Sequence, residues 1–113
     1  MIKLSAFSDD LAADWDRSVQ VAQEVGIEGL EVRNVWGKSS KDLTEDDARR
    51  MARALKGTGI AVSCLGSTYG RRFWLDDADS RKMTEDVLAK MIRFCEILDT
   101  DKIRIFALWI EGY

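Results

Sequence analysis

Charged residues inside otherwise apolar, strand-like runs are the feature that most restricts how this chain can fold. The run 102–112 is dense in Ile, Phe and Trp, yet Arg104 interrupts it near its start. Upstream, Glu31 and Arg33 alternate with apolar residues in the segment 29–36. A strand buried on both faces of an open parallel sheet reads as nearly continuous hydrophobic residues, so each charge needs a partner or water. The pattern therefore predicts strands with one apolar and one partly polar face, as in a barrel wall with helices outside and a cavity inside.

Strand-like and helix-like segments alternate along the chain. Asp14, Thr44 and Ser80 are the expected N-terminal caps of three helices, and the segments 8–14 and 37–43 read as loops. The order β-α-β-α-β-α-β, with connections too long for hairpins, predicts a parallel sheet with right-handed crossovers. The expected strands are 2–7, 29–36, 60–65 and 102–110. Each of the three expected helices has a buried apolar stripe at helical spacing. The stripes are Trp15, Val19, Ala22 and Val25 in the first helix, Ala48, Met51, Ala52 and Leu55 in the second, and Thr84, Val87, Leu88, Met91, Ile92, Cys95 and Leu98 in the third.

Two architectures fit this order, a doubly wound sheet and a segment of a (β/α)8 barrel. A doubly wound nucleotide-binding sheet would have a glycine-rich turn after its first strand, and the segment 5–14 contains no glycine. Polar and charged residues also share one alternating face of each strand, where Glu31 could be neutralised by a cation. We therefore predict a single α/β domain over 1–113, a (β/α)4 half-barrel with parallel strands and helices on the outer face. The polar face consists of Lys3, Ser5, Glu31, Arg33, Ser63 and Arg104.

The composition excludes several classes of function. A net charge of −3 argues against a general affinity for nucleic acid or anionic membranes. No segment approaches the ~20 apolar residues of a membrane-spanning helix, and the N-terminus does not resemble a signal peptide. Cys64 and Cys95 are far apart and the chain has no histidine, which excludes zinc-finger spacing and a thiolate–imidazole pair. We expect buried free thiols and a cytoplasmic location.

Three segments together resemble the sugar phosphate isomerase/epimerase family: GIEGLEVR at 26–33, VSCLGS at 62–67 and DKIRIFALW at 101–109. Members of that family share the xylose-isomerase-like TIM barrel, which the endonuclease IV type of DNA-repair enzyme also uses. The resemblance covers the whole chain but reaches only strands one to four, the N-terminal half of that fold. It implies an enzyme that uses a divalent metal (Mn, Mg or Zn) to shift a carbonyl or invert a stereocentre on a sugar or polyol.

In that family the metal ligands are acidic and histidine residues on strands five to eight. The resemblance therefore implies that this chain supplies the substrate pocket, lacks the metal-binding half and is inactive alone. Two alternatives stay open: a non-catalytic, self-assembling (β/α)4 module, and an endonuclease-IV-like repair fold, which the acidic balance disfavours.

Glu31 and Arg33 are the strongest candidates for functional residues on the second strand. Glu31 is interpreted as a catalytic residue that contacts substrate hydroxyls or positions another group at the mouth of the second strand. The alternative is an interior ion pair that neutralises buried charge, with Arg33, Lys3 or Arg104 as the partner.

Aromatic and basic residues near the strand ends are the other candidates. Trp36, Trp74 and Trp109 lie at or just beyond strand ends, where indole rings suit the C–H faces of a sugar, or simply pack as loop residues. Arg71 in the segment 69–74 is suited to phosphate, to single-stranded nucleic acid, or to solvent. The candidate substrate-binding residues are Arg33, Trp36, Arg71, Trp74, Arg104, Trp109 and Glu111, and no metal ligand is predicted.

The expected ligand is a sugar or sugar phosphate, with no membrane partner and no nucleic acid. Four parallel strands with helices on one side leave an inner face and two strand edges uncovered, so we expect a homodimer or pairing with a second half-barrel. In the alternative, the strands flatten and the third helix crosses to cover the inner face, which carries Phe7, Phe106 and Leu108.

Overall fold

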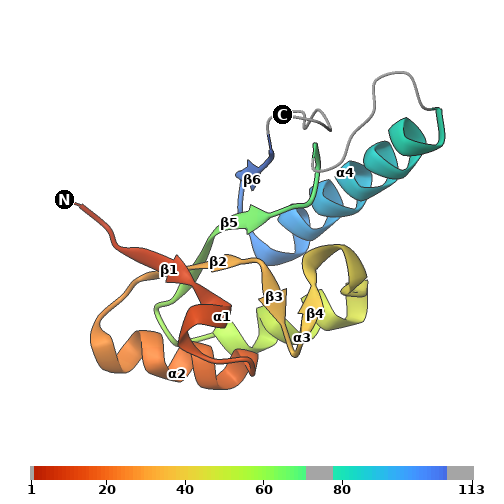
Figure 1. Cartoon of the computed structure of the whole chain (residues 1–113). Helices are drawn as coiled ribbons and strands as arrows, with labels where there is room; N and C mark the ends of the chain where they lie inside the picture. Colours follow the sequence, from red (N-terminus) through yellow and green to blue (C-terminus); the bar gives the residue numbers. More distant parts are fainter. Residues whose placement is uncertain (1, 71–77, 107–113) are drawn as a thin grey trace.

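The computed structural model describes residues 2–70 and 78–106 (Figure 1). Strands and helices alternate along most of this length, as the sequence predicts. The elements are β1 (Ser5–Phe7), α1 (Ser8–Leu11), α2 (Trp15–Val25), β2 (Gly29–Val32), β3 (Asn34–Val35), β4 (Lys38–Ser39), the 3-10 turn η1 (Ser40–Asp42), α3 (Glu45–Leu55), β5 (Ala61–Gly66), α4 (Ala78–Leu98) and β6 (Ile103–Arg104).

Four parallel strands form the main sheet, in the order β1-β2-β5-β6. Because the strands lie side by side in chain order and each is separated from the next by a helix, the sheet follows the order of a barrel wall rather than that of a doubly wound sheet. The register of β2 against β5 shifts between Leu30 and Glu31, where the pairing is irregular. The predicted parallel α/β architecture is confirmed.

The hydrophobic core lies between this sheet and the three longer helices, α2, α3 and α4 (Figure 1). The helix α4 packs beside α3 and belongs to the same core, so it does not cross to the inner face. Fully buried core residues come from strands and helices alike: Leu30, Val32 and Leu65 from β2 and β5, and Trp15, Ala22, Met51, Met91 and Phe94 from the helices.

The predicted caps of α2 and α3 are confirmed. The Asp14 carboxylate accepts a hydrogen bond from the backbone N–H of Arg17 at 3.0 Å, and Gly26 ends α2 with a φ of 79°. Thr44 and Asp47 form a reciprocal capping box, with distances of 2.9 and 3.0 Å. The expected cap at Ser80 is wrong, because α4 already begins at Ala78.

The predicted second strand, 29–36, is too long. The parallel strand ends at Val32, and β3 and β4 form a separate antiparallel hairpin. Trp36 and Gly37 form its two-residue turn with φ values of 52° and 73°, and two consecutive positive φ angles are typical of a type I′ turn. The expected loop 8–14 likewise contains the short helix α1.

Two side chains assigned to buried stripes are exposed, Val25 on α2 and Ile92 on α4. The two free thiols, Cys64 and Cys95, are half-buried rather than fully buried. In the fourth predicted strand, only Ile103–Arg104 pairs with β5 among the described residues, and 107–110 lies outside them. None of the helices described here has the length and apolar character needed to cross a membrane.

Candidate functional site at the strand carboxyl ends

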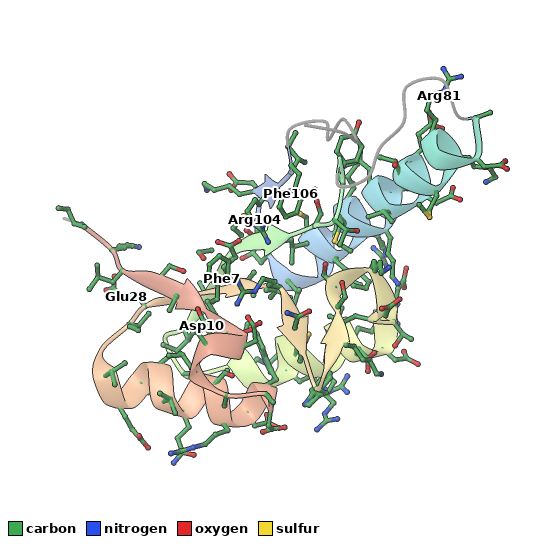
Figure 2. All side chains as sticks on the ribbon, viewed as in Figure 1. Phe7, Asp10, Glu28, Arg81, Arg104 and Phe106 are labelled. Carbon is green, nitrogen blue, oxygen red and sulfur yellow. The ribbon has the colours of Figure 1, made fainter. Side chains whose placement is uncertain are left out.

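Because the strands of the main sheet are parallel, their carboxyl ends meet at one edge, and the inner face there carries polar side chains. Phe7 ends β1, Gly66 ends β5 and Arg104 ends β6. Phe7, Arg104 and Phe106 lie close to one another in this region (Figure 2). In barrel enzymes this end of the strands holds the active site.

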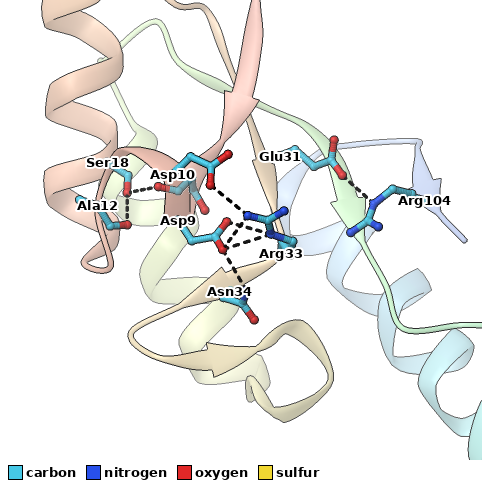
Figure 3. Close-up of polar contacts among 9 residues, drawn as sticks. Asp9, Asp10, Ala12, Ser18, Glu31, Arg33, Asn34 and Arg104 are labelled. Atoms are coloured by element: carbon cyan, nitrogen blue, oxygen red, sulfur yellow. Dashed lines mark hydrogen bonds and ion pairs between the residues drawn. The ribbon is translucent and has the colours of Figure 1, made fainter. Parts of the chain in front are cut away.

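Glu31 and Arg104 form an ion pair across the inner face of the sheet (Figure 3). The Arg104 Nε donates to Glu31 Oε1 at 2.9 Å, and both side chains are half-buried. Strand β5 lies between β2 and β6, so the pair spans it over Gly66. A Cβ atom at Gly66 would lie 2.6 Å from Arg104 Nη2 and 3.3 Å from Glu31 Oε1. Because glycine has no side chain, position 66 leaves the space in which the Glu31–Arg104 pair forms.

Arg33 belongs to a second network, made with residues that follow β1. Its Nε donates to Asp9 Oδ2 at 3.1 Å, its Nη2 contacts Asp10 Oδ1 at 3.1 Å, and Asn34 Nδ2 donates to Asp9 Oδ2 at 2.9 Å (Figure 3). Burial alone would raise the pKa of Asp9, but the hydrogen bonds from Asn34 and Arg33 and the charge of Arg33 outweigh it, so the pKa lies below its usual value. The hydrogen bond to Asp9 in turn raises the pKa of Arg33. This network fixes an ionised carboxylate at the end of β1.

Two phenylalanine rings lie against these guanidinium groups. The Arg33 guanidinium carbon lies 4.1 Å from the centre of the Phe7 ring. That of Arg104 lies 5.7 Å from the Phe7 ring and 5.0 Å from the Phe106 ring. These distances are within the range of cation–π attraction, which restrains the orientation of both arginines.

A shallow hollow beside this cluster is lined by hydroxyl, amide and guanidinium side chains together with one phenylalanine. Ser67 Oγ donates to the Arg104 carbonyl at 2.6 Å, and Ser40 Oγ donates to the Gly66 carbonyl at 2.8 Å, so both hydroxyls help to hold the loops at the strand ends. Such a lining offers donors and acceptors for the hydroxyl groups of a small polar ligand. The hollow is formed by Arg33, Asn34, Ser39, Gly66, Ser67, Thr68, Arg104 and Phe106.

The structure brings together three of the predicted site residues, Glu31, Arg33 and Arg104. Of the predicted charge pairings, that of Glu31 with Arg104 is confirmed, whereas Arg33 pairs with Asp9 and Asp10 instead of Glu31. Four of the five other candidates lie outside the described residues, namely Arg71, Trp74, Trp109 and Glu111.

Trp36 lies apart from this cluster. Its indole Nε1 donates to Asp14 Oδ1 at 3.0 Å, and the Arg50 guanidinium lies 4.3 Å from its ring centre. These partners come from the start of α2 and from α3, and the ring packs against the core. This placement matches the loop-packing alternative for Trp36.

Sequence reasoning missed Asp9 and Asn34, which share the site with Arg33. Each lies two positions beyond the last residue of a main-sheet strand, Asp9 after β1 and Asn34 after β2. Because the carboxyl ends of neighbouring parallel strands meet, this position is the signal that could have identified them.

The described residues do not fit the divalent metal that the resemblance implies. They contain no group of three or more Cys, Asp or Glu residues that could hold a metal ion. The carboxylates of Asp9, Asp10 and Glu31 already pair with arginines. No chemical step of these residues is therefore assigned to a metal.

No family model and no curated protein matches this sequence. Solved structures match over nearly the whole chain. A D-psicose 3-epimerase determined in the presence of D-fructose aligns with a TM-score of 0.69 and 14% identity, over 92% of this chain and 37% of that one. A family 2 AP endonuclease from Brucella melitensis aligns with a TM-score of 0.68 and 18% identity, over 99% of this chain and 43% of that one. The described part of the chain has the parallel β/α fold of part of a TIM barrel.

A third structure agrees with this partial TIM barrel. The probable 3-DHS dehydratase AsbF of Bacillus anthracis, involved in petrobactin synthesis, aligns with a TM-score of 0.69 and 22% identity, over 94% of this chain and 38% of that one. At identities this low, the structural alignments show a shared fold, which the sequence analysis predicted. The chain spans about two-fifths of the length of the TIM barrels it matches, 37–43%.

Proposed function

We propose that this chain is the pocket-forming half of an enzyme that resembles sugar phosphate isomerases and epimerases and acts on a sugar or polyol. In this proposal it supplies substrate-binding side chains, and a second half holds the divalent metal and completes the active site. The chain alone would then bind substrate weakly and have no isomerase activity. The proposal is supported by the fold and by the polar inner face at the strand ends.

The observation that carries the proposal is the Glu31–Arg104 pair over Gly66. Arg104 holds the Glu31 carboxylate through one oxygen, while the side chain stays partly exposed on the inner face. A restrained, ionised carboxylate in this position can accept hydrogen bonds from vicinal hydroxyl groups of a sugar. Glu31 is the proposed catalytic or orienting residue, and Arg104 is the residue that positions it.

The neighbouring residues suit the other parts of a sugar. The Phe7 and Phe106 rings offer apolar surface for C–H groups, and Arg33 offers N–H groups to a hydroxyl or an anionic substituent. The proposed binding set outside the described residues is Arg71, Trp74, Trp109 and Glu111.

The proposal can be tested by NMR titration of the chain with D-fructose. We expect millimolar binding that perturbs the backbone signals of Glu31, Gly66 and Arg104. Glu31→Gln should weaken binding roughly tenfold or more, since a hydrogen bond to a charged group contributes about 1.5–3 kcal/mol.

The matched control is Glu45→Gln, which removes a carboxylate from another glutamate–arginine pair, on the exposed face of α3. It should leave binding unchanged. A second hollow at the opposite ends of the strands, lined by Asp99 and Lys102 among others, provides the contradicting outcome. Perturbations centred there, or equal binding by Glu31→Gln and the unmodified chain, would refute the assignment.

A further inference from the structure

A hollow between the hairpin β3–β4, the segment that follows β5 and the first half of α4 adjoins the candidate site (Figure 1). Its volume is about 510 Å³, within the range of small-molecule sites. This hairpin hollow is lined by Asn34, Ser39, Lys41, Thr68 and Tyr69 together with residues of α4. Three of them, Asn34, Ser39 and Thr68, also line the hollow at the strand carboxyl ends. The two hollows are therefore continuous, and one ligand can extend from the inner face of the sheet into the hairpin hollow.

The lining of the hairpin hollow combines one cation with neutral hydrogen-bonding groups. Lys41 is its only charged residue among the described residues, and no ion pair within 2–70 and 78–106 involves the Lys41 ammonium group. Ser39, Thr68 and Tyr69 add hydroxyl groups, and the described lining contains no carboxylate. A cation with several neutral donors and no negative charge beside it is suited to an oxyanion.

The backbone that carries Lys41 is held from two directions. The Ser40 hydroxyl donates to the Gly66 carbonyl at 2.8 Å, and the Ser40 backbone N–H donates to the Arg33 carbonyl at 2.9 Å. The Lys90 ammonium group of α4 contacts the Lys41 carbonyl itself. These contacts fix η1 to the end of β5 and to α4, so the Lys41 side chain leaves a restrained backbone at the border of the hollow.

The hairpin that forms one wall of the hollow contains a strained residue. Asn34 and Ser39 face each other across its two strands, and Trp36 at its tip has a φ of 52°, which a tryptophan rarely adopts. The Trp36 backbone N–H donates to the Ala13 carbonyl at 2.8 Å, and its indole N–H donates to Asp14. Strain of this kind persists where neighbouring contacts enforce it, and it clusters at functional sites. The hairpin therefore places Asn34 and Ser39 at the junction of the two hollows.

We infer that the hairpin hollow binds a phosphate group, with Lys41 as its counter-ion and the hydroxyl groups of Ser39, Thr68 and Tyr69 as further donors. A phosphate monoester carries up to two negative charges at pH 7 and three terminal oxygens, so it can accept hydrogen bonds from several of these groups at once. If the proposed function holds, on which this step rests, the phosphate is a substituent of the substrate whose hydroxyl groups lie at Glu31. The substrate class is then a phosphorylated sugar or polyol, bound across both hollows.

The other cations near the candidate site are less available to an anion. Arg33 already pairs with two carboxylates after β1, and Arg104 already pairs with Glu31. A further hollow, on the outer side of Lys41, is lined by Asp79 and Asp86 as well as by lysines. A phosphate there would meet like charge, which favours the hairpin hollow.

NMR titration of the chain with inorganic phosphate, D-fructose and D-fructose 6-phosphate tests this inference. We expect D-fructose 6-phosphate to bind roughly tenfold or more tightly than D-fructose, because the phosphate adds a charge-assisted hydrogen bond. It should perturb the backbone signals of Ser39, Lys41 and Thr68 as well as that of Glu31. Inorganic phosphate alone should perturb the first three and leave Glu31 unaffected.

Two substitutions at Lys41 and one matched control show which residue holds the phosphate. Lys41→Gln should lower the affinity for D-fructose 6-phosphate to that for D-fructose, and Lys41→Arg should restore most of the difference because it keeps the positive charge. Lys56→Gln removes the same charge at the end of α3, outside the lining of the hairpin hollow, and should bind D-fructose 6-phosphate like the unmodified chain.

The outcomes separate this inference from the proposed function. Equal affinities for the two sugars, or equal binding of D-fructose 6-phosphate by Lys41→Gln and the unmodified chain, would overturn the inference and leave Glu31 as a sugar-binding residue. Phosphate binding at Lys41, in a chain whose Glu31 responds to neither sugar, would support the hairpin hollow and refute the proposed function. Perturbations by inorganic phosphate at Lys82 and Asp86 without Lys41 would place the anion in the outer hollow and overturn the inference.

Discussion

Replacing Gly66 by alanine tests the central geometric feature of the candidate site. The added Cβ would lie 2.6 Å from Arg104 Nη2 and 2.9 Å from the Val32 carbonyl oxygen. The guanidinium group can move aside, but Val32 belongs to the paired strand β2, so its carbonyl can move only if the sheet shifts. Overpacking of this kind costs about 1–3 kcal/mol. The lower backbone entropy of alanine in the unfolded chain offsets about 0.4–1 kcal/mol of that cost.

We therefore expect Gly66→Ala to lower the free energy of unfolding by about 1–2 kcal/mol, measured by urea denaturation at pH 7. A double-mutant cycle with Arg104→Met separates the two contacts. If the side-chain contact dominates, Gly66→Ala should cost less in the Arg104→Met background than alone. If the carbonyl contact dominates, the cost should be the same in both. A change below about 0.5 kcal/mol would refute the conclusion that the bare backbone at Gly66 makes room for the ion pair.

Three further predictions concern single side chains. Asp14→Ala removes the cap of α2 and the acceptor of the Trp36 indole N–H, so it should lower the free energy of unfolding by about 1–2 kcal/mol in thermal denaturation. The control Asp16→Ala, in the same helical turn, should cost less than half of that. The pKa of Asp9 is lower in the folded chain, so its stabilising effect is fully present above the unfolded pKa of about 4 and is lost progressively as the pH falls through the lower folded pKa. Urea unfolding at pH 7 and pH 3 should therefore show a smaller difference in stability for Asp9→Asn than for the unmodified chain. Burial raises the pKa values of Cys64 and Cys95, so both thiols should react with iodoacetamide at pH 8 more slowly than free cysteine, and equal rates would contradict this.

The alternation of charged and apolar residues in the strands was enough to predict much of the fold. Glu31 and Arg104 could be placed on one inner face because side chains alternate along a strand. Opposite charge left three possible partners for Glu31, namely Lys3, Arg33 and Arg104, and the structure selects Arg104. The helix cap at Thr44 could be predicted because the two residues of the capping box, Thr44 and Asp47, lie three positions apart in the sequence.

The failures arise where tertiary contacts decide the outcome. Trp36 adopts a positive φ, which a tryptophan rarely does, so the sequence alone read it as a continuing strand instead of a hairpin turn. Arg33 had several acidic residues within reach, and its choice of Asp9 depends on the short helix α1, which periodicity over four residues cannot reveal. Val25 and Ile92 match the helical period but are exposed, because burial depends on which elements pack against each helix and not on the period alone.

The Glu31–Arg104 pair also has a consequence for the order in which the protein matures during synthesis. The two residues are separated by 73 positions, and the two helices α3 and α4 lie between them in the chain. Closing so long a loop is entropically unfavourable until α3, α4 and β5 have already shortened the path. On the ribosome, Glu31 therefore emerges long before its counter-ion, and its strand must remain solvated on the inner side until β6 has been translated. The inner face of the sheet is thus the last part of this segment to acquire its final charge balance.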